Sequence, residues 1–408
     1  MKPMTGFLYQ NIHLSTFRPE HNGFLFPSTD KKSDETRLVL DGGSSTSLEE
    51  SVGFLDGKNV YIVASSKGFF LCCQQMQNPM ECYRWMMIQS SLSTDPIQFY
   101  MRKQDPIKFG QEKGYPMEYY VYNPSAEQWL TLPKPRYHNK QMAVGFSCTN
   151  NNMVDDTDLF CYAIVRYEIP SNFWMTEKRS IVTIESFSSE SSEWTTKDIK
   201  LDAPHLLYPV DHPAVVVDGI FFWLDIKHQI IAIDVVGRCG WQLNLPHSDG
   251  TRCGWLLNLP HDTNLFNSYN LYALDGSLHY VSDDGGLIRI WTLDRSNFRC
   301  PNAKWLIKYQ GRFCDEFPEI FGPPAPAADS LRVKHLGFHP DNPQNYYCYY
   351  NGKIIAFDMH NKTMQVLDTF SQFPSFNRWS KYFLYEWNEW PRLLPLLKKS
   401  SLMTRFRR

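Results

Sequence analysis

The sequence lacks any long apolar run. No window of about 18 consecutive apolar residues occurs, and a membrane-spanning helix needs about that many. The best candidate, residues 214–236, is interrupted by Asp218, Gly219, Asp225 and Lys227. The N-terminus also lacks the apolar segment of a signal peptide. We therefore expect no membrane span and no membrane partner, and we predict a cytoplasmic or nuclear protein.

A disulfide framework is also missing. Ten cysteines are spread over 408 residues, and none forms a Cys-x-x-Cys pair. A chain of this length can build a core without disulfides, so we expect reduced thiols. Cys72 and Cys73 lie in an apolar run that predicts a strand, where adjacent side chains point to opposite faces. We expect both to pack in the core.

No excess of one charge sign is present. The chain has 41 Lys and Arg against 43 Asp and Glu, which gives a formal net charge of -2. The two signs are mixed along the chain, and this pattern does not favour nucleic acid as a partner. One basic cluster lies in residues 391–408, which we predict to be a solvated C-terminal tail, with a weak nuclear signal as the alternative.

Sequence patterns of catalysis are absent as well. No glycine-rich phosphate loop, Gly-x-Ser-x-Gly elbow or nucleophile beside a base is found. The segment Ser282 to Gly286 resembles a sialidase Asp box, but without its Thr and aromatic residue we predict a hairpin turn. His335 and His339 are four apart on a predicted strand and would share a face, yet they have no third ligand nearby. We predict no catalytic, cofactor-binding or metal-binding residue, no cofactor and no enzymatic activity.

Aromatic residues, in contrast, are abundant, at 15% of the chain. Between Tyr119 and Arg136 they form a compact pattern: an aromatic and β-branched run, an Asn123-Pro124 turn, and a second run that begins at Trp129. This pattern predicts two paired strands joined by a tight turn.

The same pattern recurs in degenerate form along the chain. Three Asp-Gly or Asn-Gly turns, at 218–219, 275–276 and 351–352, separate apolar runs and predict hairpins. Four units have a Trp at the start of their last strand, whereas the fifth has Val366 near that place. The expected strands are 60–64, 69–73, 97–101, 119–122, 129–132, 142–147, 160–167, 181–188, 194–201, 214–217, 220–224, 229–235, 241–245, 270–274, 277–281, 287–293, 304–309, 334–339, 345–350, 353–357 and 364–369.

Units of about four strands that repeat every 40 to 60 residues or so are typical of β-propeller blades. We therefore predict an all-β propeller of four-stranded antiparallel blades. Strands near Phe24 and Val39 would join residues 381–387 in a closing blade, which gives six blades, with seven as the alternative. The predicted organisation is an N-terminal segment with short strands (1–50), a propeller (51–390) and the tail (391–408).

One decapeptide occurs twice. Residues 238–247 are repeated at 252–261 with one difference, Gln242 against Leu256, so fourteen residues are duplicated in tandem. A blade has one outer strand, so the two copies should compete for one place. The duplication has no function, or it exposes an apolar loop to a partner.

Several ordered motifs resemble those of the plant F-box-associated domain, a large family of plant F-box proteins. They cover most of the chain, from about residue 6 to residue 395. The motifs are residues 65–73, 120–124 with 128–133, 187–190 with 193–194, 217–224, and 230–234 before Trp241.

This resemblance implies a kelch-like β-propeller that presents a protein target to a ubiquitin ligase of the SCF (Skp-cullin-F-box) type. The F-box, which docks on the Skp-type adaptor, is not recognisable before the propeller, where residues 6–10 resemble the segment that follows an F-box. We therefore expect a protein target, and the adaptor and cullin only if the full gene product contains an F-box. The alternative is a propeller enzyme or carbohydrate-binding domain of the galactose-oxidase and kelch type.

The sequence leaves the residues that bind the target unknown. Residues 74–95 and 150–158 are candidate contact loops, although ordinary solvated loops fit the same sequences. The identity of the target cannot be derived, because binding loops vary over a constant scaffold.

Overall fold

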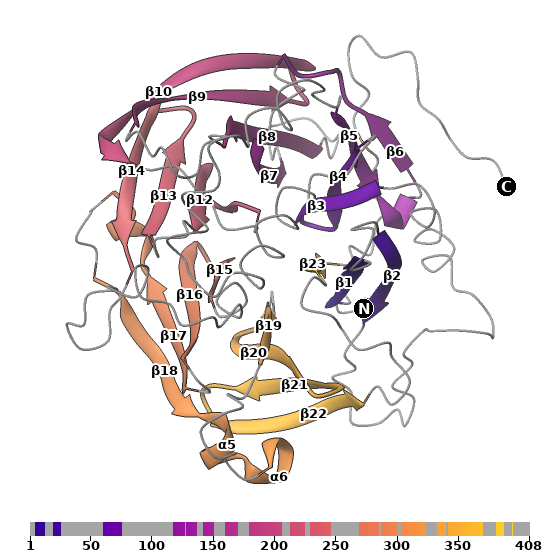
Figure 1. Cartoon of the computed structure of the whole chain (residues 1–408), viewed down its shortest axis with the longest axis vertical. Coiled ribbons are helices and arrows are strands. Elements are labelled where there is room, and N and C mark those ends of the chain that lie inside the picture. Colours follow the sequence, from indigo (N-terminus) through magenta and orange to yellow (C-terminus); the bar gives the residue numbers. More distant parts are fainter. Residues whose placement is uncertain are drawn as a thin grey trace, which may run out of the picture.

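The computed structural model describes most of the strand-forming part of the chain (Figure 1). The described residues are 5–12, 19–25, 60–75, 117–126, 128–136, 142–150, 160–169, 179–205, 213–224, 229–245, 269–284, 287–299, 304–322, 333–339, 342–369, 381–386 and 394. The predicted strand at 97–101, the strand near Val39 and the second decapeptide at 252–261 lie outside them.

The strands form consecutive antiparallel groups around a central axis (Figure 1). Blade 1 consists of β3 (Val60–Ser66), β4 (Phe69–Gln75), β5 (Met117–Asn123) and β6 (Gln128–Thr131). Blade 2 consists of β7 (Met142–Asn150), β8 (Phe160–Glu168), β9 (Arg179–Ser188) and β10 (Glu193–His205). Blade 3 consists of β11 (Val215–Val217), β12 (Ile220–Leu224), β13 (Gln229–Asp234) and β14 (Cys239–Asn244).

Two further blades follow in the same order. Blade 4 consists of β15 (Tyr269–Leu274), β16 (Ser277–Asp284), β17 (Leu287–Leu293) and β18 (Leu306–Arg312). Blade 5 consists of β19 (Lys334–His339), β20 (Asn342–Tyr350), β21 (Lys353–Asp358) and β22 (Thr363–Thr369). The helical segments are short: η1 (Pro124–Ala126), η4 (Arg295–Asn297), α5 (Phe313–Glu316) and α6 (Pro318–Phe321). None of the helices in the described ranges has the length and apolarity needed to cross a bilayer.

A closing sheet joins the two ends of the described chain. β1 (Thr5–Ile12) pairs on one side with β2 (Pro19–Leu25) and on the other with β23 (Lys381–Glu386), in both cases antiparallel. The first strands of the blades and β23 contact one another in the cyclic order β3, β7, β11, β15, β19, β23. The all-β propeller fold and its four-stranded antiparallel blades are therefore as predicted. The count of six, and the boundaries at residues 50 and 390, stay predictions because long ranges lie outside the described residues.

Blades 2 and 3 are joined into one eight-stranded sheet. β10 pairs with β9 on one side and, in parallel, with β14 on the other, where Lys200 lies beside Cys239 and Leu201 beside Gly240. A Cβ atom on Gly240 would lie 2.7 Å from Leu201 Cδ2 and 3.2 Å from the Ala232 carbonyl oxygen. Only glycine therefore lets the two outer strands approach this closely.

The predicted hairpin turns adopt the backbone expected of them. Asp218, Asp275 and Asn351 have φ values of 52°, 49° and 44°, and the glycine after each is also positive. Two successive positive φ angles are the mark of the type I′ turn that suits twisted hairpins. The Asn351 turn joins the second and third strands of its blade, whereas the two Asp-Gly turns join the first and second strands of theirs.

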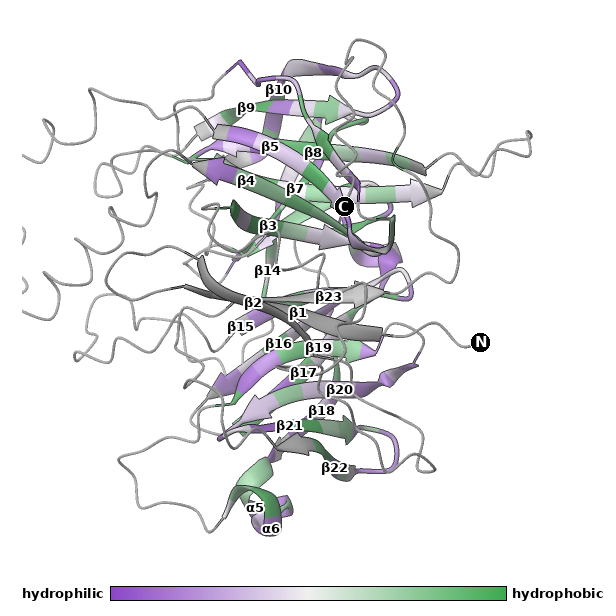
Figure 2. Ribbon diagram, turned by 90° about the vertical axis from the view of Figure 1, so that its right-hand side faces the viewer, coloured by the Kyte–Doolittle hydropathy of each residue, from purple (hydrophilic) through white to green (hydrophobic). Residues whose placement is uncertain are grey.

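The hydrophobic core is divided among the blade interfaces. Buried apolar side chains form four clusters, which lie between blades 1 and 2, 2 and 3, 3 and 4, and 4 and 5. Figure 2 shows the sheets from the side, with apolar stretches in strands such as β3 and β21. Blades 2, 3 and 4 thus bury both faces against their neighbours, and the angle between blades depends on what lies at these interfaces.

The inner strands run in one direction, which gives the propeller two different ends. Cys148, near the end of β7, donates its backbone N–H to Ser66 Oγ at the end of β3, at 3.1 Å. Gly145 of β7 pairs in parallel with Ala214, next to β11. Strands alternate in direction within a blade. The turns from first to second and from third to fourth strand therefore lie at one end, which we name the turn face. All other connections lie at the opposite end, the connection face.

Candidate functional site

The inner strands carry few groups that could do chemistry. In β3, β7, β11 and β15 there is no Asp, Glu, Arg, Lys or His. The titratable residues of this kind on the inner strands are Lys334, His335 and His339 of β19 and Lys381 and Glu386 of β23. Among the described residues, no group of three or more His, Cys, Asp and Glu side chains is placed to hold a metal ion. These inner strands therefore offer no observation that supports the alternative of a propeller enzyme.

His335 and His339 do not share a face, which corrects our prediction. The pairing of β19 with β20 shifts between His335 and Gly337, and again before His339. As a result the ring of His335 lies against Tyr346 and that of His339 against Tyr347, two neighbours on one strand that point to opposite faces. The buried His335 Nδ1 is hydrogen-bonded to Tyr346 Oη. Burial lowers the pKa of His335 to about 3, so it is a neutral core residue near pH 7.

Cys72 and Cys73 are both buried, on opposite faces of β4, as their position in a strand predicts. Burial raises the pKa of the Cys72 thiol well above its usual value. All seven cysteines in the described ranges are free thiols. The segment Ser282 to Gly286 lies at a hairpin, since Asp283 and Asp284 of β16 pair with Ile288 and Leu287 of β17.

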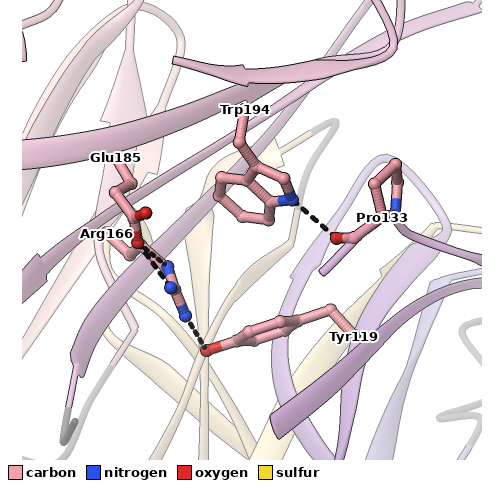
Figure 3. A network of polar contacts seen from close by, with 5 residues as sticks. All are labelled: Tyr119, Pro133, Arg166, Glu185 and Trp194. Atoms are coloured by element: carbon pink, nitrogen blue, oxygen red, sulfur yellow. Dashed lines mark hydrogen bonds and ion pairs between the residues drawn. The ribbon is translucent and has the colours of Figure 1, made fainter. Parts of the chain in front are cut away.

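The most unusual polar group in the molecule is an ion pair at the interface of blades 1 and 2. Arg166 of β8 and Glu185 of β9 face each other across the strands, with side chains 0% and 1% exposed. Arg166 Nε donates to Glu185 Oε2 at 2.9 Å, and Nη2 donates to the same oxygen. The third guanidinium nitrogen, Nη1, reaches across to Tyr119 Oη of blade 1 at 3.3 Å (Figure 3).

Two aromatic rings enclose the guanidinium. Arg166 Cζ lies 5.4 Å from the ring centroid of Tyr119 and 5.1 Å from that of Trp194. The indole N–H of Trp194 donates to the carbonyl oxygen of Pro133, just beyond blade 1, at 2.7 Å (Figure 3). Burial raises the pKa of Tyr119 to about 12, although Arg166 opposes the shift. The phenol therefore stays neutral and accepts from the guanidinium. We call the five residues of Figure 3 the buried clasp: Tyr119, Pro133, Arg166, Glu185 and Trp194.

A second cluster repeats this chemistry between blades 3 and 4. Arg299 pairs with Asp234 and lies over the ring of Trp241, with Cζ 5.4 Å from the centroid. The indole N–H of Trp241 donates to the carbonyl oxygen of Phe298. Here the Arg299 side chain is 64% exposed and that of Asp234 12%. We call this cluster the exposed clasp.

A one-residue shift explains why the two Trp residues reach opposite neighbours. Trp129 and Trp194 are the second residues of their strands and pair with Tyr122 and Phe187. Trp241 is the third residue of β14 and pairs with Ala232. Since successive strand residues point to opposite faces, Trp241 turns toward the following blade and Trp194 toward the preceding one.

The same comparison corrects our assignment in blade 5. Met364 pairs with Phe357, next to the end of β21, which is the position that Trp129 and Trp194 hold in their blades. Val366 lies two residues further on and pairs with Ile355. The repeat therefore places Met364, not Val366, where blades 1 and 2 have Trp.

Both clasps match each charge with an opposite charge and each indole with a carbonyl. Such an arrangement fixes the position of one blade against the next and leaves no activated nucleophile or base. Neither clasp was predicted from the sequence. A usable signal was present for the first, because Arg166 interrupts the apolar run 162–167 and Glu185 follows Ile184 in another.

The candidate contact loops leave the propeller from opposite faces. The connection 76–116, which contains most of residues 74–95, joins the second and third strands of blade 1 at the connection face. The connection 151–159 joins the first two strands of blade 2 at the turn face. Both segments lie outside the described residues, but the strand ends that hold them show that they leave from different surfaces.

The strand pairing and the clasps together define a repeat protein of the β-propeller class, with blades held by apolar and polar contacts. Residues 107–310, half of the chain, match the model of the F-box protein At3g26010-like β-propeller. The chain belongs to this family of plant F-box protein propellers.

Comparison with individual proteins gives shorter or weaker matches. The chain is 29% identical over 110 residues to the F-box protein At5g03970 of Arabidopsis thaliana, which is 27% of this chain and 24% of that protein. The match thus spans about a quarter of the relative's length. A chain in the crystal structure of a mitotic checkpoint complex is similar with a TM-score of 0.30 and 12% identity, over 60% of this chain and 56% of the other. The fold is therefore established by the strand pairing and the family model.

Proposed function

We propose that this propeller is the target-binding part of an SCF-type ubiquitin ligase receptor and that it acts without catalysing a reaction itself. The match of residues 107–310 to the propeller of F-box proteins carries this proposal. The F-box is the module expected to bind a Skp-type adaptor. Binding of that adaptor, and through it of the cullin, is proposed only for a gene product that contains an F-box.

We further propose that the target is bound at the connection face. On the turn face, most strands are joined by two-residue turns such as 67–68 and 218–219 or by four-residue turns such as 189–192. The longest connection within blades 1 to 5, 76–116, and the longest between two of these five blades, 245–268, leave from the connection face. Long connections on a rigid scaffold can vary in sequence without loss of the fold, which is what recognition of a specific partner requires.

The proposal is tested by exchanging one loop on each face. The whole chain, tagged, is expressed in plant cells in three forms: unchanged, with 76–116 replaced by a short Gly-Ser linker, and with 151–159 replaced in the same way. Proteins that co-purify with each form are quantified by mass spectrometry. We expect a target that is retained by the 151–159 variant and lost with the 76–116 variant, while circular dichroism shows that both variants fold.

The ligase role needs a separate measurement. The full gene product is expressed with the captured target, and the ubiquitin chains on the target are measured with and without a proteasome inhibitor. We expect ubiquitination to depend on the propeller's retention of the target. A target that binds all three forms equally would contradict the connection-face assignment, and a bound target that is never ubiquitinated would contradict the receptor role.

A further inference from the structure

The outer strand of blade 3 occupies a slot with specific requirements. β14 is hydrogen-bonded to β13 along its length and to β10 at its start. Its Trp241 is 6% exposed and bonded to the Phe298 carbonyl, its Leu243 is fully buried, and its Gly240 faces atoms that leave no room for a Cβ. A segment fits this slot only if it has glycine, Trp and Leu at these three places.

The second decapeptide meets every one of these requirements. Gly254, Trp255 and Leu257 stand where the first copy has Gly240, Trp241 and Leu243, and the flanking Arg, Cys, Asn, Leu, Pro and His are also the same. The one difference, Leu256 for Gln242, falls at a position that is half-exposed in β14. Apolar and polar residues are both tolerated at such a place in a strand.

We propose that residues 252–261 bind the same slot as residues 238–247, so that either copy can form the outer strand of blade 3. The contacts with β13, β10 and Phe298 would be the same in the two arrangements, because the residues that make them are identical. What differs is the chain on either side. With the first copy in place, the connection to β13 is 235–238; with the second copy, it becomes 235–252.

Loop closure favours the first copy only modestly. Exchange lengthens the connection before the strand and shortens the one after it from 245–268 to 259–268, and the two changes largely cancel, leaving roughly a threefold preference. The turn adds to this preference, since Gly237 donates its N–H to Asp234 Oδ1 at 2.7 Å when the first copy is bound. The first copy is accordingly the one seen in β14.

Exchange would change the surface of the propeller without changing its core. The connection before β14 lies on the turn face and the one after it on the connection face. Fourteen residues would therefore move from the connection face to the turn face. An effect of this move on target binding rests on the proposed function. The exchange itself is independent of that function.

The test blocks one copy at a time and follows backbone protection. In Gly240→Val, the new side chain collides with Leu201 and the Ala232 carbonyl, and valine itself is a good strand residue. Hydrogen exchange measured by mass spectrometry should then show protection at 253–258 and its loss at 239–244. The matched control, Gly254→Val, should keep protection at 239–244.

A chain that has only the first copy shows how much stability Gly240→Val costs when no second copy can form the outer strand. In a variant that lacks residues 252–265, Gly240→Val should lower the thermal unfolding midpoint. In the full chain the same substitution should cause less than half of that drop. The proposal is overturned if Gly240→Val in the full chain gives no protection at 253–258, if protection stays at 239–244, or if the drop equals that of the one-copy chain. None of these readouts involves a target protein, so they are independent of the ligase role.

Discussion

The buried clasp and the exposed clasp are built from the same parts in different surroundings. Each has an arginine paired with a carboxylate, a Trp ring beneath the guanidinium, and an indole N–H bonded to a backbone carbonyl of the adjoining blade or its flank. In the first the ion pair is fully buried, and in the second the Arg299 side chain is 64% exposed. The list of contacts is therefore nearly the same, but the consequence of losing one partner is not.

Burial decides this difference through desolvation. A charge in water keeps its hydration when its partner is removed, so an exposed pair contributes little. A charge held inside the protein cannot regain that hydration unless the structure opens, so a buried pair is hard to break even if its net contribution to folding is small. We expect the ion pair of the buried clasp to be sensitive to single substitutions and the ion pair of the exposed clasp to tolerate them.

Arg166→Met should have the largest effect. It removes the guanidinium that neutralises the buried Glu185 carboxylate and should reduce the free energy of unfolding by about 3–5 kcal/mol. The measurement is a urea unfolding curve followed by tryptophan fluorescence. The double variant Arg166→Met with Glu185→Leu removes both charges and should regain most of the loss. A double variant as unstable as the single one would show that desolvation is not the cause.

A buried neutral group at the next interface extends the comparison to pH. His335 lies against Tyr346, a member of the hydrophobic cluster between blades 4 and 5, and its pKa is lowered to about 3 in the folded protein. Its ordinary pKa is about 6.5, so below that pH the unfolded chain binds a proton that the folded one does not. Stability should be full above pH 6.5 and fall as pH drops toward 3, by about 2 kcal/mol between pH 6.5 and pH 5 for this one group.

Substitution isolates this share of the pH dependence. His335→Gln should flatten the fall in unfolding free energy between pH 6.5 and pH 5, measured by urea titration at each pH. Part of the slope should remain, since burial also lowers the pKa of His279, to about 4. The reference is the unchanged chain, titrated with urea at the same pH values. Equal slopes for His335→Gln and the unchanged chain would contradict the assignment.

The indole hydrogen bonds should have intermediate effects. Trp194→Phe and Trp241→Phe keep an aromatic ring but remove the N–H that the Pro133 and Phe298 carbonyls accept. Each should cost about 1 kcal/mol, and Trp241→Phe more than Trp194→Phe because Trp241 is the more buried. Urea unfolding of the two variants measures the difference. The reverse order would mean that ring packing, not the hydrogen bond, dominates.

Arg299→Met should have the smallest effect. The Arg299 side chain is 64% exposed, so solvent screens the pair, and Asp234, at 12% exposed, keeps the hydrogen bond that it accepts from the Gly237 N–H. Loss of the pair should therefore cost less than about 1 kcal/mol. The cost should shrink further in concentrated salt, which screens exposed charges. Unfolding curves at low and high salt provide the check. A loss as large as that of Arg166→Met would remove the distinction between the two clasps.

The fold was predictable where short segments determine it. The turns at Asp218, Asp275 and Asn351 need positive φ angles, and the apolar runs beside them read directly as strands. The number of strands in a blade follows from the repeat. These features depend on residues that are neighbours in the sequence, so they can be predicted from one sequence without a structure.

The polar clasps were missed because they depend on register across distant strands. Arg166 meets Glu185 through one pairing and Tyr119 through another, and no local pattern states either partner. The error at His335 and His339 has a similar origin, since the shift in pairing with β20 reversed the face of one of them. Trp241 stands one residue later in its strand than Trp194, a difference that the sequence pattern does not show. It therefore contacts the following blade, whereas Trp194 contacts the preceding one.

The pairing of β1 with β23 also constrains how the protein is made. Thr5 lies opposite Glu386, so the hairpin of β1 and β2 leaves the ribosome early and lacks its inner partner until nearly the whole chain has been synthesised. This contact spans almost the full sequence, and contacts of such length form slowly. Chains that end before residue 381 would leave the ring open, with the edge of β1 unpaired. Because β23 follows blades 1 to 5 in the sequence, the ring can close only after all five blades have left the ribosome.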